Sequence, residues 1–254
     1  MNIDEIKLDV SSSAIDEIVD QLNINGIVCL DNAISPAILD RFRGEVQKEL
    51  KDRGDRYFSK INPADAGGSA FSILKRSNDF IQVMRKVASN TLNRSIGDDE
   101  NLSVLRVITG KKAESQTLNF HYDAYALTAL IPIFIPDGAI QESGHLVALL
   151  NSRKFRRYQI INIIEKFIIQ NRITSWVLSV LVRRNESKYV QKMLPGNIYL
   201  FWGYRTLHAN FSVDHEFLRS TILFHCGDVH RDSMIDRSIK KIRHNNEITN
   251  LNEK

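Results

Sequence analysis

Hydrophobic positions in the first hundred residues recur mostly at helical spacing, with one early strand between the helices. Ser12 or Ser13 can cap a helix that ends near Leu22, because a side-chain oxygen there can accept from the free N–H groups of the first turn. An Asn-Gly turn then leads to the apolar run IVCL at 27–30, which predicts a short strand.

Two further helices follow in this part of the chain. Ser35, followed directly by proline, matches an N-cap with proline at the first helical position, and the helix it opens runs to about Lys51. Residues 52–78 carry loop signals. Asp79 then caps another helical pattern, which we expect Gly97 to stop.

From Leu102 the pattern changes to short β-rich runs separated by turn signals. These runs lie at 102–109, 118–125, 126–135, 144–150, 197–202 and 219–225. Several short strands with few helices between them predict a sandwich or jelly roll. We therefore expect a mainly β fold with flanking helices, a double-stranded β-helix with N-terminal helices and a helical insert. The expected single domain comprises a helical part (1–100), a jelly-roll core (102–230) that contains the insert (155–190), and a polar tail (233–254).

Composition is ordinary for a folded protein and excludes a disordered or fibrous chain. The chain has 254 residues and a mass of 29.1 kDa, with 43% hydrophobic and 25% charged residues. Its two cysteines, Cys29 and Cys226, lie far apart, which argues against a disulfide framework or a cysteine zinc site. Sparse cysteine together with a polar, acidic N-terminus favours a cytoplasmic protein.

Charge is unevenly distributed along the chain. The net charge is +4, but residues 151–192 hold ten basic and two acidic side chains, so the remainder is acidic. This basic segment indicates an anionic substrate, membrane surface or partner, with a solvated helix as the plain alternative. Its apolar stretch at 155–184 is broken by charges and lacks the about 18 uncharged apolar residues of a membrane span. We expect a helical lid, a dimer face or a membrane-surface contact there.

Candidate chemistry begins at His121 and Asp123. Residues two apart in a strand point the same way, so the imidazole and the carboxylate can converge. With a second histidine they would form the facial triad of non-haem Fe(II) oxygenases, and His208 after a later strand can supply it. A histidine and an aspartate two positions apart are by themselves weak evidence for a metal site. His230 and Asp232 match it too, and we interpret that match as accidental because it follows the last predicted strand.

An arginine strengthens the first match. Arg219 comes eleven positions after His208 and opens a predicted strand, where its fork could bind a carboxylate in bidentate fashion. Taken singly, His208 could be a satisfied core histidine, and Arg219 could pair with Asp214 or Glu216. The ordered set of all four residues is much harder to obtain by chance.

On these motifs the sequence resembles the Fe(II)/2-oxoglutarate-dependent dioxygenases, and within them the phytanoyl-CoA dioxygenase-like group. The similar segments are NGIVCLDNAISPAILDRFRGEVQKEL, HYD with SGHLVALLNSR, and PGNIYLFWGYRTLHANFSVDHEFLRSTILFH. The resemblance implies that His121, Asp123 and His208 hold Fe(II), that Arg219 binds the distal carboxylate of 2-oxoglutarate, and that O2 is the co-substrate. Similar halogenases carry glycine or alanine in place of Asp123, so the carboxylate favours hydroxylation.

The resemblance also suggests secondary sites and shows two departures. Asn210 stands where the family often has a small polar co-substrate ligand. Strand alternation makes Thr128 and Arg106 candidates to line the site, and we expect Thr128 to be a further cofactor-binding residue. The family's proline-glycine-serine-histidine corner is replaced at 150–153, and the insert at 155–190 replaces a shorter connection.

The leading hypothesis is a hydroxylase of an anionic small molecule, such as an acyl-CoA, a carrier-protein-linked group or a phosphorylated lipid. The insert at 155–190 suggests a peripheral membrane or carrier-protein contact. The alternative is a non-catalytic jelly-roll binding module that contacts a partner or membrane surface through the insert.

Nucleic-acid demethylation is suggested only by the pI of about 9.0. We expect no nucleic-acid partner, because no basic stripe interleaves with aromatic residues. A zinc hydrolase would need a nearby glutamate base, which the motif lacks.

Overall fold

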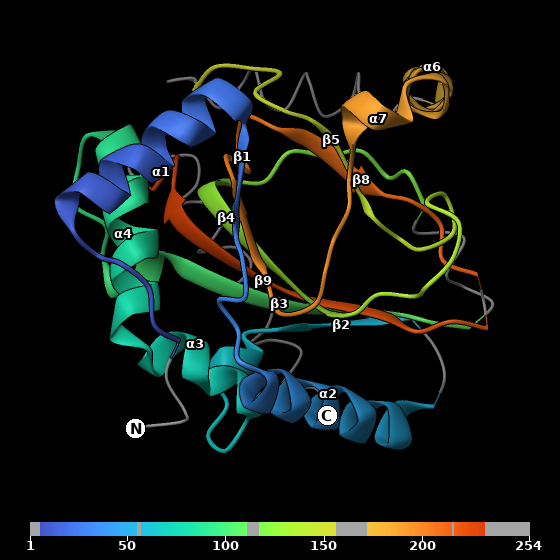
Figure 1. The fold of residues 1–254 in the computed structure, drawn as a ribbon, viewed down its shortest axis with the longest axis horizontal. Coiled ribbons are helices and arrows are strands. Elements are labelled where there is room, and N and C mark those ends of the chain that lie inside the picture. The colour runs from blue at the N-terminus through green and yellow to red at the C-terminus, as the bar shows by residue number, and fades with distance from the viewer. Residues whose placement is uncertain (1–5, 55–56, 111–116, 156–171, 215, 232–254) are drawn as a thin grey trace, which may run out of the picture.

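Two antiparallel β-sheets form the centre of the structure, a computed structural model that describes residues 6–54, 57–110, 117–155, 172–214 and 216–231 (Figure 1). The larger sheet has the strand order β1-β7-β4-β9-β3-β2, and the smaller has the order β6-β5-β8. The strands are β1 (Ile27–Leu30), β2 (Phe58–Ile61), β3 (Asn101–Ile108), β4 (Tyr125–Phe134), β5 (Leu146–Leu149), β6 (Val190–Gln191), β7 (Ile198–Phe201), β8 (Leu207–Asn210) and β9 (Arg219–Asp228). The mainly β fold expected from the sequence is confirmed.

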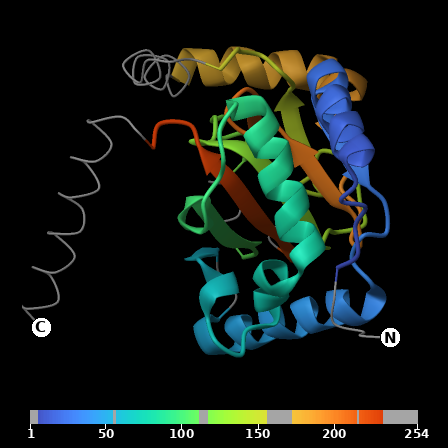
Figure 2. The ribbon, with the colours of Figure 1, turned by 90° about the vertical axis from the view of Figure 1, so that its left-hand side faces the viewer.

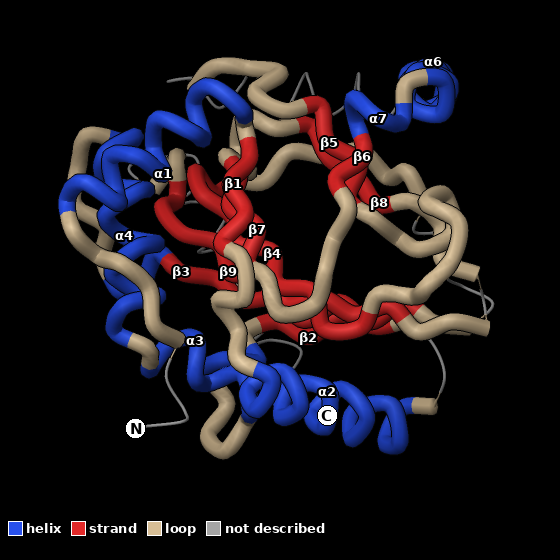
Figure 3. Tube along the Cα trace, viewed as in Figure 1, coloured by secondary structure: helices blue, strands red, loops and turns tan. Residues whose placement is uncertain are grey.

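Four N-terminal helices cover the outer face of the larger sheet, and Figure 2 shows α4 lying across its strands. The helices are α1 (Ser12–Asn25), α2 (Pro36–Arg53), α3 (Ile73–Arg76) and α4 (Asn78–Leu92). Two further helices, α6 (Arg172–Arg184) and α7 (Glu186–Tyr189), lie between β5 and β6 in the chain. Figure 3 shows the strands in the middle, with α1 to α4 and α6 on different outer sides. The apolar faces of α1 to α4 and the outer side chains of the larger sheet form one core.

Strand alternation gives the larger sheet two chemically different faces. On β9, Ile222, Phe224 and Cys226 belong to the core beneath the helices. Successive side chains of a strand point to opposite sides. The alternate residues of β9 therefore face the smaller sheet, and these are Arg219, Thr221, Leu223 and His225. Polar and charged groups are thereby collected between the two sheets.

Local capping explains which helix boundaries the sequence predicts correctly. Ser35 caps α2 as expected, with its hydroxyl 3.3 Å from the N–H of Ile38. The cap of α1 is Ser11 instead of Ser12 or Ser13, and its hydroxyl accepts from the N–H of Ala14 at 3.3 Å. The strand at 27–30 is confirmed.

The prediction for α4 was wrong at both ends. Asp79 lies inside the first turn, where its carboxylate is 3.4 Å from the N–H of Leu8, and Ser77 occupies the cap position. The helix ends at Asn93, whose φ of 51° is left-handed, and so it never reaches Gly97. Contacts with the N-terminal segment accompany the start of the helix, where the Ser77 hydroxyl also donates to the carbonyl of Ile6, and the left-handed Asn93 marks its end.

The described part of the insert packs on the outer face of the smaller sheet. Leu178 and Val182 of α6 contact the cluster that contains Val147 of β5 and Leu207 of β8. Residues 156–171 of the insert and the tail from 232 onward lie outside the described residues. Among the described helices, none combines the length and apolar character that crossing a membrane requires.

Glu100 ties the end of α4 to the residues after β9, and its replacement should destabilise the fold. The carboxylate is 2% exposed and accepts hydrogen bonds from Arg94, from Arg231 and from the N–H of Gly97. Burial alone would raise its pKa, but these bonds outweigh burial and lower the pKa to about 2.

A carboxyl with a lowered folded-state pKa stabilises the fold above its unfolded pKa of about 4.5, and this stability is lost as the pH falls toward 2. Glu100→Gln should therefore reduce the free energy of unfolding by about 3 kcal/mol at pH 7. In urea unfolding, the difference from wild type should shrink as the pH is lowered from about 4.5. The exposed Glu17→Gln serves as control, and a deficit that is unchanged at pH 2 to 3 would contradict the prediction.

Candidate metal centre

Backbone pairing brings the first histidine of the motif beside the second. The N–H and C=O groups of His121 and His208 bond to each other reciprocally, each at 3.0 Å, although His121 lies outside any regular strand. The N–H of Asp123 donates to the carbonyl of Gly203 at 3.0 Å. Residues 118–124 are thus held as an irregular edge and not as the regular strand that the pattern predicted, whereas Tyr125 belongs to β4.

Three side chains converge between the sheets. The potential ligand atoms of His121, Asp123 and His208 all lie within 4.8 Å of one another, and the Nε2 of His208 is 3.6 Å from Oδ1 of Asp123. The two imidazole centroids are 4.4 Å apart. The structure therefore places the predicted set in one cluster.

Both histidines are held in the form that binds metals. The Nδ1 of His121 lies 2.9 Å from the carbonyl of Asn119, and the Nδ1 of His208 lies 3.0 Å from the carbonyl of Thr206. A carbonyl can only accept, so each Nδ1 carries a proton, and Nε2 is the ring nitrogen left to bind a metal. Such a second hydrogen bond is typical of metal-binding histidines.

One buried atom of the cluster has no partner. The His208 side chain is 5% exposed, and its Nε2 has no hydrogen-bond partner among the described residues. An unsatisfied buried polar atom is costly, and a metal ion at the convergence point would satisfy it. Two imidazoles and one carboxylate are the donor set of non-haem Fe(II) sites with open positions, so these residues fit the metal that the sequence implies.

The protonation states also suit a metal. Burial alone would raise the pKa of Asp123, but the surrounding histidines and the hydroxyl of Thr128 outweigh burial and hold it below its usual range. Burial and the neighbouring His208 lower the pKa of His121 to about 4. At neutral pH the carboxylate is ionised and this imidazole is neutral, which are the forms that coordinate a metal.

Thr128 and His225 hold the second oxygen of the carboxylate. The Thr128 hydroxyl donates to Oδ2 of Asp123 at 2.6 Å and lies 2.9 Å from Nδ1 of His225, which is itself 3.5 Å from the same oxygen. The β4–β9 register places Thr128 directly opposite His225. Oδ1 of Asp123 is thereby left toward His208. A Cβ at Gly203 would collide with both Thr128 and Asp123, so glycine is required at that close approach.

From the sequence, Thr128 is a predicted cofactor-binding residue, and His225 has no predicted role. In the structure the hydroxyl of Thr128 contacts Asp123 and His225, while its role toward a co-substrate stays a prediction. A signal for His225 was present, because it lies six positions after Arg219 on the same strand and therefore shares its face.

Removing the Thr128 hydroxyl should weaken metal binding. In Thr128→Val, Oδ2 of Asp123 loses its short hydrogen bond and the carboxylate can rotate away from His208. We expect the dissociation constant for Fe(II) to rise about 10- to 100-fold in an anaerobic titration. Thr128→Ser, which keeps the hydroxyl, should stay near wild type. Equal Fe(II) affinity of the valine and serine variants would refute this role.

Arg219 is buried, and no carboxylate in the described part of the chain pairs with it. The side chain is 3% exposed, its Nε donates to the carbonyl of Gly144 at 2.7 Å, and its Nη1 lies 3.5 Å from the hydroxyl of Thr221. Among the described residues it pairs with no acid, so the alternative pairing with Asp214 or Glu216 is not formed. Burial, with a contribution from Arg106, lowers its pKa to about 9. A buried cation of this kind suits an anionic ligand.

Asn210 lies two positions after His208 on β8 and is also buried. Strand alternation puts the two side chains on the same face. Its Nδ2 donates to the carbonyl of Phe211 at 3.0 Å. The location agrees with the candidate role, and contact with a co-substrate stays a prediction.

The altered corner at 150–153 has a structural role. The guanidinium of Arg153 lies between the rings of Tyr122 and Tyr204, 3.8 Å and 4.0 Å from their centroids, and its Nε donates to the carbonyl of Tyr204 at 2.5 Å. Arg153 is buried, so it does not contribute to the basic surface expected for residues 151–192. His230 of the second motif contacts the Tyr204 hydroxyl at 3.3 Å and does not belong to the metal cluster.

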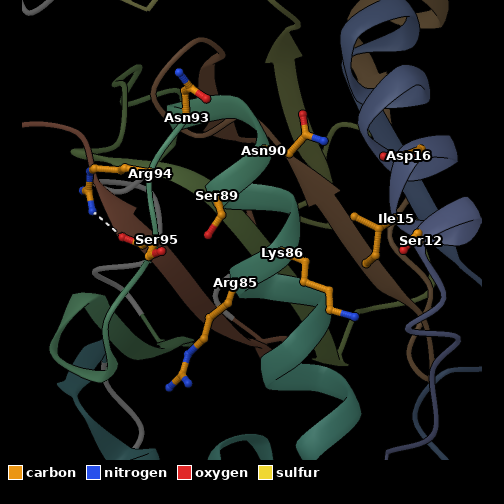
Figure 4. A pocket seen from close by; sticks show the side chains of 10 residues that line it. All are labelled: Ser12, Ile15, Asp16, Arg85, Lys86, Ser89, Asn90, Asn93, Arg94 and Ser95. Carbon is orange, nitrogen blue, oxygen red and sulfur yellow. Dashed lines mark hydrogen bonds between the residues drawn. The ribbon is translucent and has the colours of Figure 1, made fainter.

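A polar pocket of 730 Å³ lies elsewhere, between α1 and α4 (Figure 4). Its cations already bond to the chain: Lys86 donates to the carbonyl of Val10, Arg94 to that of Ser95, and Arg85 pairs with Asp98. No member of the metal cluster lines this pocket. It is a separate surface feature on the helical side of the larger sheet.

Comparison with known proteins identifies the fold. No family model matches the chain, and no curated protein sequence matches it. Among solved structures, a prolyl 4-hydroxylase from Phytophthora capsici has 11% identity over 91% of this chain and 70% of that one, with a TM-score of 0.56. A prolyl hydroxylase from Trichoplax adhaerens, bound to a hypoxia inducible factor peptide, has 15% identity over 85% and 90%, with a TM-score of 0.54.

An enzyme of small-molecule biosynthesis is similar as well. The non-heme alpha ketoglutarate dependent carbocyclase SnoK from nogalamycin biosynthesis has 13% identity over 87% of this chain and 89% of that one, with a TM-score of 0.51. The same architecture therefore occurs in enzymes that act on peptides and in enzymes of natural-product synthesis. The chain has the jelly-roll fold of the prolyl hydroxylases and of the non-haem α-ketoglutarate-dependent enzymes.

Proposed function

We propose that this protein is an Fe(II)- and 2-oxoglutarate-dependent oxygenase. The observation that carries the proposal is the convergence of His121, Asp123 and His208. At its centre lies the buried Nε2 of His208, which has no hydrogen-bond partner among the described residues. The fold shared with α-ketoglutarate-dependent enzymes supports the same conclusion. When bound, Fe(II) and 2-oxoglutarate supply activation of O2 and oxidation of a C–H bond, which no protein side chain provides.

The residues of the chain have distinct roles in this proposal. His121, Asp123 and His208 would hold the metal on three adjacent corners and leave the others for co-substrate and O2. Arg219 would bind the distal carboxylate of 2-oxoglutarate, because its buried guanidinium has no acid partner among the described residues. Thr128 and His225 would keep Asp123 oriented as a ligand through Oδ1.

Hydroxylation is the proposed outcome, since Asp123 occupies the position that similar halogenases leave empty. The motifs that resemble the phytanoyl-CoA dioxygenase-like group support placement in that group. An anionic small molecule is the proposed substrate. The described part of the insert covers the outer face of β5 and β8, away from His208, so its exposed Trp176 and Arg184 suit a membrane or carrier-protein contact better than direct substrate binding.

We also propose that the chain is one oxygenase domain that works in the cytoplasm. Both cysteines are free, with Cys29 exposed and Cys226 buried, which supports a reducing compartment.

Anaerobic titration tests the proposal. The protein should bind Fe(II), and adding 2-oxoglutarate to the Fe(II) form should produce a visible absorption band. Under O2, a candidate substrate should then stimulate release of succinate. A jelly-roll binding module without catalysis would bind neither ligand, and a zinc hydrolase would bind zinc but give no 2-oxoglutarate-dependent band. Either result would overturn the proposal.

A further inference from the structure

Arg106 is a second arginine on the inner face of the larger sheet. In the β3–β9 pairing it lies directly opposite Thr221, whose hydroxyl is 3.5 Å from Nη1 of Arg219. Directly paired residues of neighbouring strands place their side chains on the same face. The two guanidinium groups thus belong to one face, on either side of the position of Thr221.

The guanidinium of Arg106 has no partner in the described part of the chain. It makes no hydrogen bond and no ion pair there, and it is only partly buried. Burial is the main cause of the lowered pKa of Arg219, and the charge of Arg106 adds to the effect. This agrees with the strand register, which places Arg106 near Arg219 on the inner face of the sheet.

The charges of the proposed site balance without Arg106. The two positive charges of Fe(II) and the one of Arg219 equal the negative charges of Asp123 and of the two carboxylates of 2-oxoglutarate. Arg106 adds a positive charge that no described residue neutralises. A site with one cation in excess favours a further ligand that carries a negative charge.

Apolar side chains connect Arg106 with the metal end of the sheet. Val104 and Leu102 follow it on the same face of β3, opposite Leu223 and His225 of β9, and both are partly exposed. Ile61 of β2, directly opposite Val104, is 69% exposed. Four residues of strand span about 13 Å, so this apolar stripe covers the interval between Arg106 and the level of His225.

We propose that Arg106 binds the anionic group of the primary substrate, and that this substrate is an amphiphilic oxyanion with its apolar part along Ile61, Val104 and Leu102. The part of this inference that concerns the metal centre rests on the proposed function. The anion, a carboxylate or phosphate, would lie at Arg106, and the carbon to be oxidised would lie toward His225. Specificity would come from the guanidinium, because an uncharged analogue leaves it unpaired.

Calorimetric titration tests the proposal with defined probes. The anaerobic Fe(II)/2-oxoglutarate form is titrated with octanoate, octyl phosphate and uncharged 1-octanol. In Arg106→Gln the affinity for both anions should fall about tenfold or more, while octanol affinity and 2-oxoglutarate affinity should change less than about twofold. Arg106→Lys should restore part of the anion affinity. Arg76→Gln, an exposed arginine on α3, is the control for net charge and should bind as wild type.

The outcomes separate this inference from the proposed function. Unchanged anion affinity in Arg106→Gln, or no measurable binding of either anion to wild type, overturns the inference. A loss of 2-oxoglutarate affinity with unchanged anion affinity also overturns it and would assign Arg106 to the co-substrate. If wild type binds neither Fe(II) nor 2-oxoglutarate, the proposed function fails. The anion titrations of the metal-free protein then still decide whether Arg106 is an anion site.

Discussion

His208→Ala is expected to abolish Fe(II) binding, and turnover with it. The ring is fixed by its Nδ1 contact with the carbonyl of Thr206 and by packing against Phe201, whose centroid is 5.1 Å away. Its Nε2 is therefore preorganised toward Asp123. Since loss of a residue that merely orients a ligand costs 10- to 100-fold in metal affinity, loss of a ligand should exceed about 100-fold in an anaerobic Fe(II) titration.

The second histidine motif supplies the matched control. His230→Ala removes an imidazole that contacts Tyr204 outside the metal cluster, so its Fe(II) affinity should equal that of wild type. His208→Gln keeps a polar side chain of similar size, and it separates loss of the ligand from misfolding if the alanine variant unfolds. Should both His208 variants remain folded and bind Fe(II) normally, the assignment of this cluster as the metal centre would be wrong.

Arg219→Met should have opposite effects on co-substrate binding and on stability. The variant loses the guanidinium proposed to bind the distal carboxylate, so the dissociation constant for 2-oxoglutarate should rise about 100-fold. It also removes a buried cation that has no acid partner among the described residues. We expect the free energy of unfolding of the ligand-free protein to rise by about 1 kcal/mol, because relief of the buried charge outweighs the lost bond to Gly144.

Anaerobic 2-oxoglutarate titration and urea unfolding measure these two effects. Arg219→Lys keeps the charge but not the planar fork, so it should bind 2-oxoglutarate more weakly than wild type and better than the methionine variant. Arg76→Met, at an exposed site, should change neither quantity. A methionine variant that is less stable and binds 2-oxoglutarate normally would show that Arg219 has a structural role only.

Local signals predicted the elements whose boundaries depend on neighbouring residues. Ser35 and the following proline specify the start of α2, and the apolar run at 27–30 specifies β1. Strands β2, β6 and β8 were not predicted. The sequence of β8, LHAN, alternates apolar and polar residues over only four positions, which is too short a pattern to predict a strand. It becomes a strand because it pairs with β5.

The residues of the candidate site likewise divide into those that the sequence predicted and one that it missed. The order of His121, Asp123, His208 and Arg219 along the chain was sufficient to nominate the metal set, because each residue carries chemistry that the others complement. His225 was missed because its contact with Thr128 arises from the pairing of β4 with β9, 97 positions apart in the sequence. No periodicity within either strand records that pairing.

The sequence by itself determined the class of fold and the residue types of a facial metal site, since periodicity, capping and spacing act over a few neighbouring residues. Only the tertiary structure decided which of two matching histidine motifs has a partner histidine, which oxygen of Asp123 is left for a metal, and which arginines lack an acid partner among the described residues. Those properties depend on strand register, and register is fixed by contacts between segments far apart in the chain.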